Sequence, residues 1–230
     1  VAEWVANPDL AVNVTVTQVL STGDLVATTQ FWDPGAFIEG YTLAPHLRWT
    51  HGDIKGYNEG DSVPMSVVLS SQHLGEIPSV TIEVGFDFID NNSATNPIHG
   101  IDFLTQYWTE TPEAPFNTPG NSTNPFWIHP SEGILTDWVR MDNLLDEGGN
   151  QLLQVWRFTV DLEEGYDIAI VRFGAHLAVT DLSDPENPYY GASYYPGSAL
   201  HVRMVMIDPT DNQGHRDVPI MLGEVLTPPE

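Results

Sequence analysis

The sequence predicts an all-β protein, an antiparallel β-sandwich of the jelly-roll or immunoglobulin-like kind with long loops. Two observations support this prediction. Apolar and polar residues alternate along many short segments, with the period of a half-buried strand. Clusters of proline, glycine and asparagine separate these segments, for example "FWDPGAF" and "DLSDPENPYYGASYYPGS", and such clusters favour turns. Short strands joined by long polar connections are typical of antiparallel sandwiches.

The first predicted strand shows the alternation most clearly. In Leu10–Leu20, "LAVNVTVTQVL", Val12, Val14 and Val16 fall on one face and Asn13, Thr15 and Thr17 on the other. The further predicted strands are Leu25–Trp32, Ser62–Ser70, Ser79–Ile89, Ile101–Trp108, Leu152–Leu162, Asp167–Val179, Leu200–Ile207 and Val218–Leu226. One short helix is expected over Thr136–Asp146, "TDWVRMDNLLD".

The length of 230 residues is enough for one sizeable core, and neither an internal repeat nor a clean linker divides the chain. We therefore expect a single sandwich domain over residues 21–230. Residues 1–20 form an N-terminal strand segment that is available for donation to a neighbouring subunit. The loop Thr109–Gly133 is long for one domain, and its Phe116, Phe126 and Trp127 are expected to pack onto the sandwich.

Charge excludes several classes of partner. The chain has 32 acidic and 7 basic residues, a net charge of −25, whereas nucleic acids and anionic membrane surfaces require clustered lysine and arginine. No apolar run approaches the roughly 18 residues that span a bilayer, so no membrane insertion is expected. The first residue is valine, which fits an exported chain whose signal peptide has been removed.

Catalytic motifs are absent from the sequence. No cysteine is present, which excludes disulfides, thiolate metal sites and a cysteine nucleophile. No nucleophile elbow, phosphate loop, dinucleotide fingerprint or H-E-x-x-H occurs, and carboxylates are too abundant for any one pair to indicate a glycosidase. We expect no enzyme. His176 and His201 lie in predicted strands, where a hydrogen-bonded structural histidine is the expected role.

Acidic residues gather where one predicted strand ends. In "VTIEVGFDFIDNNSATNPIHGIDF", Val80–Phe103, no lysine or arginine accompanies the candidate ligands Asp87, Asp90, Asn92 and Asp102. Such oxygens in loops are the ligands of Ca²⁺, and we expect Ca²⁺ here because unpaired carboxylates repel each other. The alternative is that these residues only form turns. Comparable clusters are Asp181, Asp184 and Asn187, and Asp208, Asp211 and Asn212.

Two features bear on sugars. Glycosylation sequons begin at Asn13, Asn91 and Asn121, and they would make an exported chain a glycoprotein. The segment "YYGASYYPG", Tyr189–Gly197, has four tyrosines in a loop that contains glycine and proline. These rings could stack on glycans. The alternative is that they cover the edge of the sandwich.

Several motifs together resemble a family of secreted bacterial and archaeal surface proteins. They are "LRWTHGDI" (Leu47–Ile54), "YNEGDSVPMSVVL" (Tyr57–Leu69), "VTIEVGFDF…GIDFLTQYW" (Val80–Trp108), "VRFGAHLAV" (Val171–Val179) and "YPGSALHVRMVMID" (Tyr195–Asp208). The resemblance implies export, a β-sandwich and a cell-surface or matrix location, and it implies no known catalysis. Asp87 and Asp102 fall on recurring acidic positions of the family.

Two residues of the last motif, His201 and Arg203, also match the family. If Val202, Met204 and Met206 face inward in a sandwich strand, His201 and Arg203 face outward. We expect them to pair with a nearby carboxylate.

Self-assembly is the function that these features favour. We expect a structural subunit of an extracellular or cell-surface filament, pilus-like fibre or sheath, a homopolymer formed by strand donation, by analogy with donor-strand complementation. A carbohydrate-binding or adhesive surface module is the alternative, and an enzyme acting on polysaccharide comes third.

Overall fold

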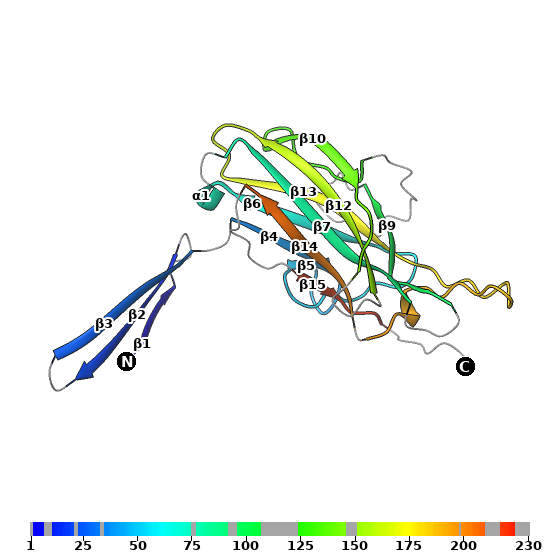
Figure 1. Ribbon diagram of the computed structural model, residues 1–230, viewed down its shortest axis with the longest axis horizontal. Helices are drawn as coiled ribbons and strands as arrows, with labels where there is room; N and C mark the ends of the chain where they lie inside the picture. Colours follow the sequence, from blue (N-terminus) through cyan, green and yellow to red (C-terminus); the bar gives the residue numbers. More distant parts are fainter. Residues whose placement is uncertain are drawn as a thin grey trace.

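The strands of the computed structural model form three antiparallel sheets, two of which pack face to face as a β-sandwich (Figure 1). The structure describes residues 2–6, 11–20, 23–32, 35–74, 77–91, 96–106, 124–145, 151–197, 199–209 and 217–223, the first three ranges by their backbone. The predicted all-β sandwich is therefore confirmed. Helical structure in these ranges is limited to a single turn, α1 (Ser71–Leu74), and a 3-10 turn, η1 (Ala192–Tyr194).

The larger layer of the sandwich has the strand order β10-β12-β7-β14-β15, and β11 and β8 pair with β12 and β7. Its strands are β7 (Ser79–Asp90), β8 (Ile98–His99), β10 (Gly133–Arg140), β11 (Leu144–Leu145), β12 (Gln151–Leu162), β14 (Leu200–Asp208) and β15 (Asp217–Ile220). The facing layer has the order β5-β4-β6-β13-β9. Its strands are β4 (Ala36–Thr42), β5 (Arg48–Thr50), β6 (Ser62–Ser70), β9 (Ile101–Thr105) and β13 (Ile168–Leu177).

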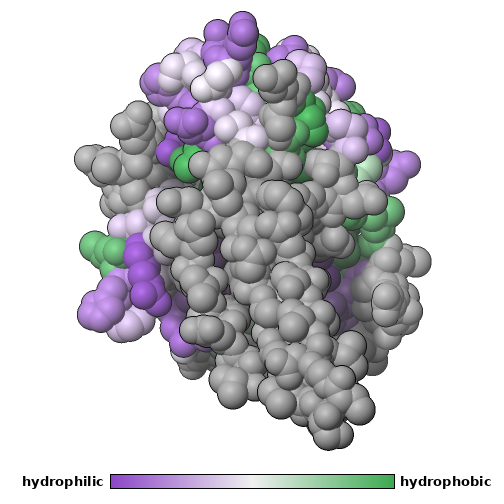
Figure 2. Space-filling model, turned by 90° about the vertical axis from the view of Figure 1, so that its left-hand side faces the viewer, coloured by the Kyte–Doolittle hydropathy of each residue, from purple (hydrophilic) through white to green (hydrophobic). Residues whose placement is uncertain are grey.

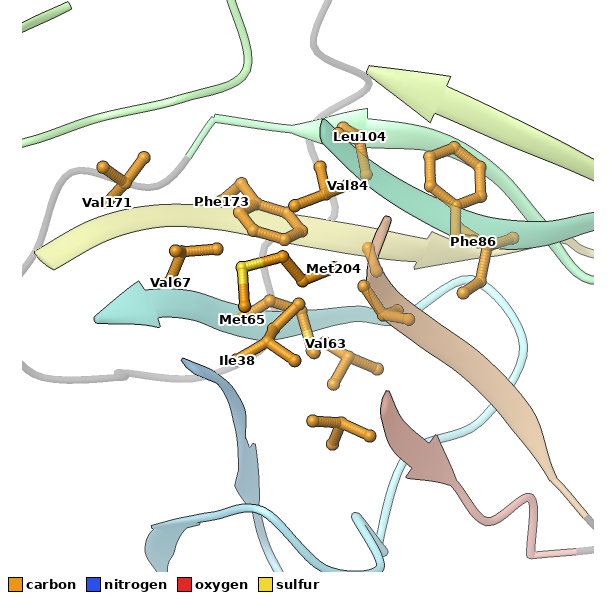
Figure 3. Packing of buried hydrophobic residues seen from close by; sticks show 14 of the residues in the cluster. Ile38, Val63, Met65, Val67, Val84, Phe86, Leu104, Val171, Phe173 and Met204 are labelled. Atoms are coloured by element: carbon orange, nitrogen blue, oxygen red, sulfur yellow. The ribbon is translucent and has the colours of Figure 1, made fainter. Parts of the chain in front are cut away.

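The core fills the space between these two layers. Alternate residues of each strand point inward, because successive side chains of a strand lie on opposite faces. Figure 3 shows Met65 and Phe173 of one layer directed toward Val84 and Met204 of the other, and all four are at most 2% exposed. Burial of such side chains stabilises the fold by about 1.5–3 kcal/mol each.

The two ends of the sandwich differ. At the end that we call proximal, the backbone N–H of Ser70 donates to Gly35, directly before β4, and the N–H of Leu162 donates to Pro78. At the opposite, distal end, β4 leaves the sheet at Thr42, β7 ends at Asp90 and β14 begins at Leu200. The acidic strand ends of the sequence therefore lie at the distal end.

The third sheet is N-terminal and has the order β1-β2-β3. It consists of β1 (Ala2–Ala6), β2 (Ala11–Leu20) and β3 (Gly23–Trp32). Figure 1 shows that it stands apart from the sandwich on the proximal side. The strand predicted over Leu10–Leu20 is therefore present, as β2. The strand predicted over Leu25–Trp32 is also present, as β3. It pairs with β2 along its whole length, so the N-terminal unit ends at Trp32 and is longer than the expected segment of residues 1–20.

The predicted helix over Thr136–Asp146 is wrong. β10 and β11 occupy most of this segment, and β10 pairs with β12 in a register that sets Trp138 against Phe158. The helix was predicted from the spacing of a few apolar residues in a short segment. Pairing with a long strand and packing of Leu135 and Trp138 against the core outweigh such a weak local preference.

Strand β4 was not predicted, and its glycine explains why. Gly40 interrupts the pattern, and glycine weakens a strand interior. In the structure, a Cβ atom on Gly40 would lie 1.9 Å from the Cδ1 atom of Ile54, which is fully buried. The glycine therefore leaves room for a core side chain from the following loop, a reason that only the tertiary structure reveals.

The described part of the long loop, from Asn124 to Gly133, packs onto the sandwich as expected. Phe126 is 1% exposed, and its ring centroid lies 4.3 Å from that of Phe158. Trp127 pairs through its backbone with Arg172, whose guanidinium lies 5.4 Å from the Trp127 ring. Phe116, the third residue of this prediction, lies outside the described residues.

Candidate functional site

Asp87 is the best-defined of the predicted site residues. Its side chain is 3% exposed. Its Oδ2 accepts the backbone N–H of His201 at 2.9 Å and lies 3.2 Å from the Nδ1 of His201. Its Oδ1 accepts a hydrogen bond of 3.0 Å from Arg203. The expected pairing of His201 and Arg203 with a carboxylate is confirmed, because β7 and β14 are neighbours.

Strand β14 agrees only in part with the expected inward face. Val202 and Met204 are buried, but a register shift follows Met204, and Ile207 rather than Met206 is the next core residue. The hydrogen bond that His201 donates to the Asp87 carboxylate raises the pKa of His201, which favours the charged imidazolium beside this carboxylate.

Asp102 lies in the other layer of the sandwich and has a comparable partner within that layer. Its Oδ1 lies 2.7 Å from the Nδ1 of His176, and the His176 ring stacks on Phe103 with centroids 4.2 Å apart. Both His176 and His201 are hydrogen-bonded, as expected. The structure thus brings His176 to Asp102, and His201 and Arg203 to Asp87, although neither aspartate has a lysine or arginine nearby in the sequence.

The predicted Ca²⁺ ligands do not come together as one cluster in the described chain. Asp87 lies on β7 and Asp102 on β9, which belong to different layers, and Asp90 is 2% exposed at the end of β7. Asn92 lies outside the described residues. Within the ranges that the structure describes, no three histidine, aspartate or glutamate side chains gather closely enough for a metal ion. The calcium site stays a prediction.

The two other acidic clusters differ in what the structure describes. The Asp181 carboxylate accepts the N–H of Ser183, and the Asp184 carboxylate accepts the N–H of Glu186 and the amide of Asn187. The side chain and the backbone of Ser183 lower the pKa of Asp181, and the Asn187 amide and the Glu186 N–H lower the pKa of Asp184. These are the local turn bonds of the alternative interpretation. Asp208 is exposed at the end of β14. Asp211 and Asn212 lie outside the described residues.

The tyrosine-rich loop covers the distal end. Tyr190 is 6% and Tyr195 2% exposed, and Tyr189 stacks on His99 with ring centroids 4.2 Å apart. Burial, helped by the charge of Asp102, raises the pKa of Tyr189 to about 12. Tyr194 packs edge-on against Tyr190. These rings are packed against the protein, as the interpretation of an edge cover expects.

Sequence reasoning missed the residue that holds this loop in place. The Glu59 carboxylate accepts the backbone N–H of Ser193 at 2.7 Å, and both the N–H and the hydroxyl of Thr180 at 2.8 Å. The signal was present, since Glu59 is the glutamate of the "NEG" turn that precedes β6. Its partners, however, lie more than a hundred residues further along the chain.

The N-terminal sheet provides the main candidate for an interaction surface. The register places Trp4 opposite Val14, and Phe31 opposite Val12. Because alternate positions share a face, Val12, Val14 and Val16 belong to a face that has no charged residue. Its other positions are Ala2, Trp4, Ala6, Gln18, Leu20, Gly23, Leu25, Ala27, Thr29 and Phe31.

The opposite face of this sheet is more polar. It carries Glu3 and Asp24, together with Asn13, Thr15, Thr17, Thr28 and Gln30, and its apolar positions are Val5, Ala11, Val19, Val26 and Trp32. β2 is already hydrogen-bonded on both sides, to β1 and β3, so it cannot be donated alone without breaking this sheet. β1 and β3 are the edge strands of the sheet.

The sequons occupy different settings. Asn13 lies in β2, Asn91 is exposed directly after β7, and Asn121 lies outside the described residues.

Comparisons with known proteins identify no relative. The chain matches no protein-family model, no curated protein and no solved structure. The resemblance to secreted surface proteins therefore stays a prediction. In the described part of the chain, no helix has the length and apolarity needed to cross a membrane.

Proposed function

We propose that this protein is a structural subunit of an extracellular or cell-surface assembly, a homopolymer in which each subunit offers its N-terminal sheet to the next. One observation carries the proposal: a sheet with one uncharged, largely apolar face stands apart from the sandwich of its own chain (Figure 1). A sheet of this kind is stable when its apolar face is buried against another element.

Charge allows a second copy to approach this face. The chain carries −25 in all, but residues 1–32 contain only Glu3, Asp9 and Asp24 as ionisable side chains, so they contribute −3. Two copies repel each other over most of their surface. Because the apolar face of the N-terminal sheet has no charge, it can approach another subunit without this cost.

The unit that is donated is the whole sheet, since β2 is paired on both sides within it. The edge strands β1 and β3 then provide backbone groups for pairing with a sandwich edge of the neighbour, and the apolar face provides the buried area. Donation in one direction is a heterologous contact, which produces an open filament unless the rotation between subunits closes a ring.

A matched pair of variants tests this function. Val14 and Thr15 are neighbours on opposite faces of β2. We expect Val14→Asp to abolish filaments in electron micrographs and to shift the sedimenting species to the monomer. Thr15→Asp adds the same charge to the polar face and is expected to assemble as the parent does. Assembly of Val14→Asp at the parental concentration, or a parent that stays monomeric in high salt, refutes the proposal.

The alternative of a carbohydrate-binding module has less support, because the four tyrosines on which it depended are packed against the protein. A glycan array with the purified chain separates the two functions.

A further inference from the structure

A cavity at the proximal end has an apolar floor. It has a volume of about 560 Å³, within the range of roughly 300–1,000 Å³ that is typical of binding pockets. Ile77, Pro78 and Leu162 line it together with Tyr166. The Tyr166 hydroxyl is buried and has no hydrogen-bond partner, and burial raises its pKa. Since buried hydroxyls are normally hydrogen-bonded, this one has an unmet hydrogen bond, which an entering group satisfies once the Tyr166 side chain turns into the cavity.

The rim of the same cavity is strongly acidic. Glu163, Glu164 and Asp167 are exposed there, and no lysine or arginine occurs between Arg157 and Arg172. Figure 2 views the molecule from the proximal side, where the coloured surface is mainly hydrophilic with smaller hydrophobic patches. The cavity therefore fits a partner with an apolar tip that is flanked by positive charge.

The chain itself carries such a tip, in the turn between β4 and β5. Leu47 is 67% exposed, more than any other large hydrophobic side chain in the described ranges. Arg48 and His46 beside it are exposed as well. Residues 43–56 contain two basic side chains, Arg48 and Lys55, against one acidic side chain, Asp53, so this segment carries +1 within a chain of −25.

The other described arginines already have partners. Arg157 pairs with Glu83 and Arg203 with Asp87. Arg140 lies over the ring of Phe88, and Arg172 over that of Trp127. The turn is therefore the part of the described surface whose charge best complements the acidic rim.

The turn and the cavity cannot meet within one molecule. Gly35, directly before β4, lies beside Ser70 and Ser71 at the cavity, and the turn lies at the far end of β4. A strand of this length, 7 residues, spans about 23 Å. A contact between them must join two copies, and it is heterologous because the two surfaces differ.

We infer that the turn Pro45–Arg48 of one subunit docks into the proximal cavity of the next. Leu47 then covers Ile77 and Leu162, and Arg48 faces Glu163 and Glu164. The Tyr166 hydroxyl donates to a backbone carbonyl of the turn. The inference rests on the proposed function and deepens it. The N-terminal sheet leaves its subunit at the proximal end, where the cavity also lies. A neighbour whose distal turn fills that cavity therefore lies beside the N-terminal sheet as well.

Two full-length variants test the contact. Leu47→Ser/Arg48→Ser removes the apolar tip and its charge, and Glu163→Gln/Glu164→Gln neutralises the rim. Each variant alone is expected to self-associate about 10–100-fold more weakly than the parent in sedimentation equilibrium. The first variant retains an intact cavity and the second an intact turn. An equimolar mixture is therefore expected to recover binding through the one intact contact.

Tyr166→Phe probes the buried hydroxyl. It is expected to weaken association about 3–10-fold while leaving the melting temperature unchanged or higher, because it removes an unsatisfied polar atom. Parental association of the turn and rim variants overturns the inference, and so does a mixture that binds no better than either variant. If those variants assemble normally while Val14→Asp does not, the inference fails and the proposed function stands. If all of them assemble normally, both fail.

Discussion

At the scale of single residues, the acidic strand end at Asp87 acquires its counter-charges from another strand. Arg203 and His201 lie more than a hundred positions away in sequence and within hydrogen-bonding distance in the structure. A local excess of carboxylates in a sequence therefore does not imply unpaired carboxylates in the fold.

Replacing Asp87 separates the ion-pair role from the calcium prediction. Asp87→Asn leaves Arg203 without its carboxylate partner, and we expect a loss of about 1.5–3 kcal/mol in the free energy of unfolding without any calcium present. Urea unfolding in calcium-free buffer measures this loss. A calcium site that includes Asp87 predicts in addition that the heat of Ca²⁺ binding, present in the parent, disappears in Asp87→Asn. Equal heats in the two proteins exclude Asp87 as a ligand.

The pair of His201 and Asp87 also predicts a pH dependence. The pKa of His201 is raised above its ordinary value of 6.5, so the folded state holds the proton more tightly than the unfolded chain. Its stabilising contribution is complete below pH 6.5 and is lost as the pH rises through the raised pKa. We expect the free energy of unfolding to fall over this window in the parent and to stay flatter in His201→Gln.

His99 provides the control for this experiment. Burial lowers its pKa below 6.5, so its contribution is present above that pH and is lost as the pH falls through the lowered value. His99→Gln should therefore leave the loss above pH 6.5 unchanged. A parent whose stability does not fall above that pH contradicts the account of His201.

At the scale of elements, close approach of backbones fixes the distal loops. A Cβ atom at Gly191 would lie 2.5 Å from the carbonyl oxygen of Ala178 and 2.6 Å from the nitrogen of Thr180. Both atoms belong to the backbone, and Glu59 holds the same segment through Thr180 and Ser193. The loop cannot move aside without breaking these contacts.

Gly191→Ala is therefore expected to destabilise the protein by about 1–3 kcal/mol, the usual cost of overpacking. Gly52→Ala is the matched control, because a Cβ atom there meets only the Thr50 hydroxyl at 3.6 Å. Thermal unfolding of both variants measures the difference. Equal melting temperatures would show that the loop adapts to the added methyl group.

The elements also show how far the sequence alone could predict this fold. The strand Ser62–Ser70 is predicted with its correct bounds, although it does not alternate and almost all of its residues are buried. Strands interrupted by glycine, such as β4, were not found, since the reason for Gly40 is a contact with Ile54. Of the contacts at the candidate site, the sequence predicts only that His201 and Arg203 pair with a carboxylate. The other contacts join strands that are distant in sequence, and such contacts leave no trace in local residue spacing.

At the scale of the whole molecule, net charge governs stability. A chain of −25 repels itself, and the repulsion between exposed charges is screened over about 10 Å at 0.1 M salt. We expect the melting temperature to rise with sodium chloride at fixed pH when a chelator is present. In a second experiment without chelator, a calcium site predicts a further rise when Ca²⁺ is added. A melting temperature that is indifferent to salt contradicts the charge account, and one that is indifferent to chelator removes the calcium prediction.

If the turn at Leu47 docks into the cavity at Tyr166 as proposed, the positions of these two surfaces at opposite ends of β4 have a consequence for growth kinetics. A head-to-tail polymer has two unlike tips, so addition at one tip proceeds at a different rate from addition at the other. A copy that lacks only one surface still joins, and then terminates that tip. Its effect is therefore substoichiometric: mean filament length falls roughly as the reciprocal of its mole fraction, long before it is abundant enough to compete for subunits.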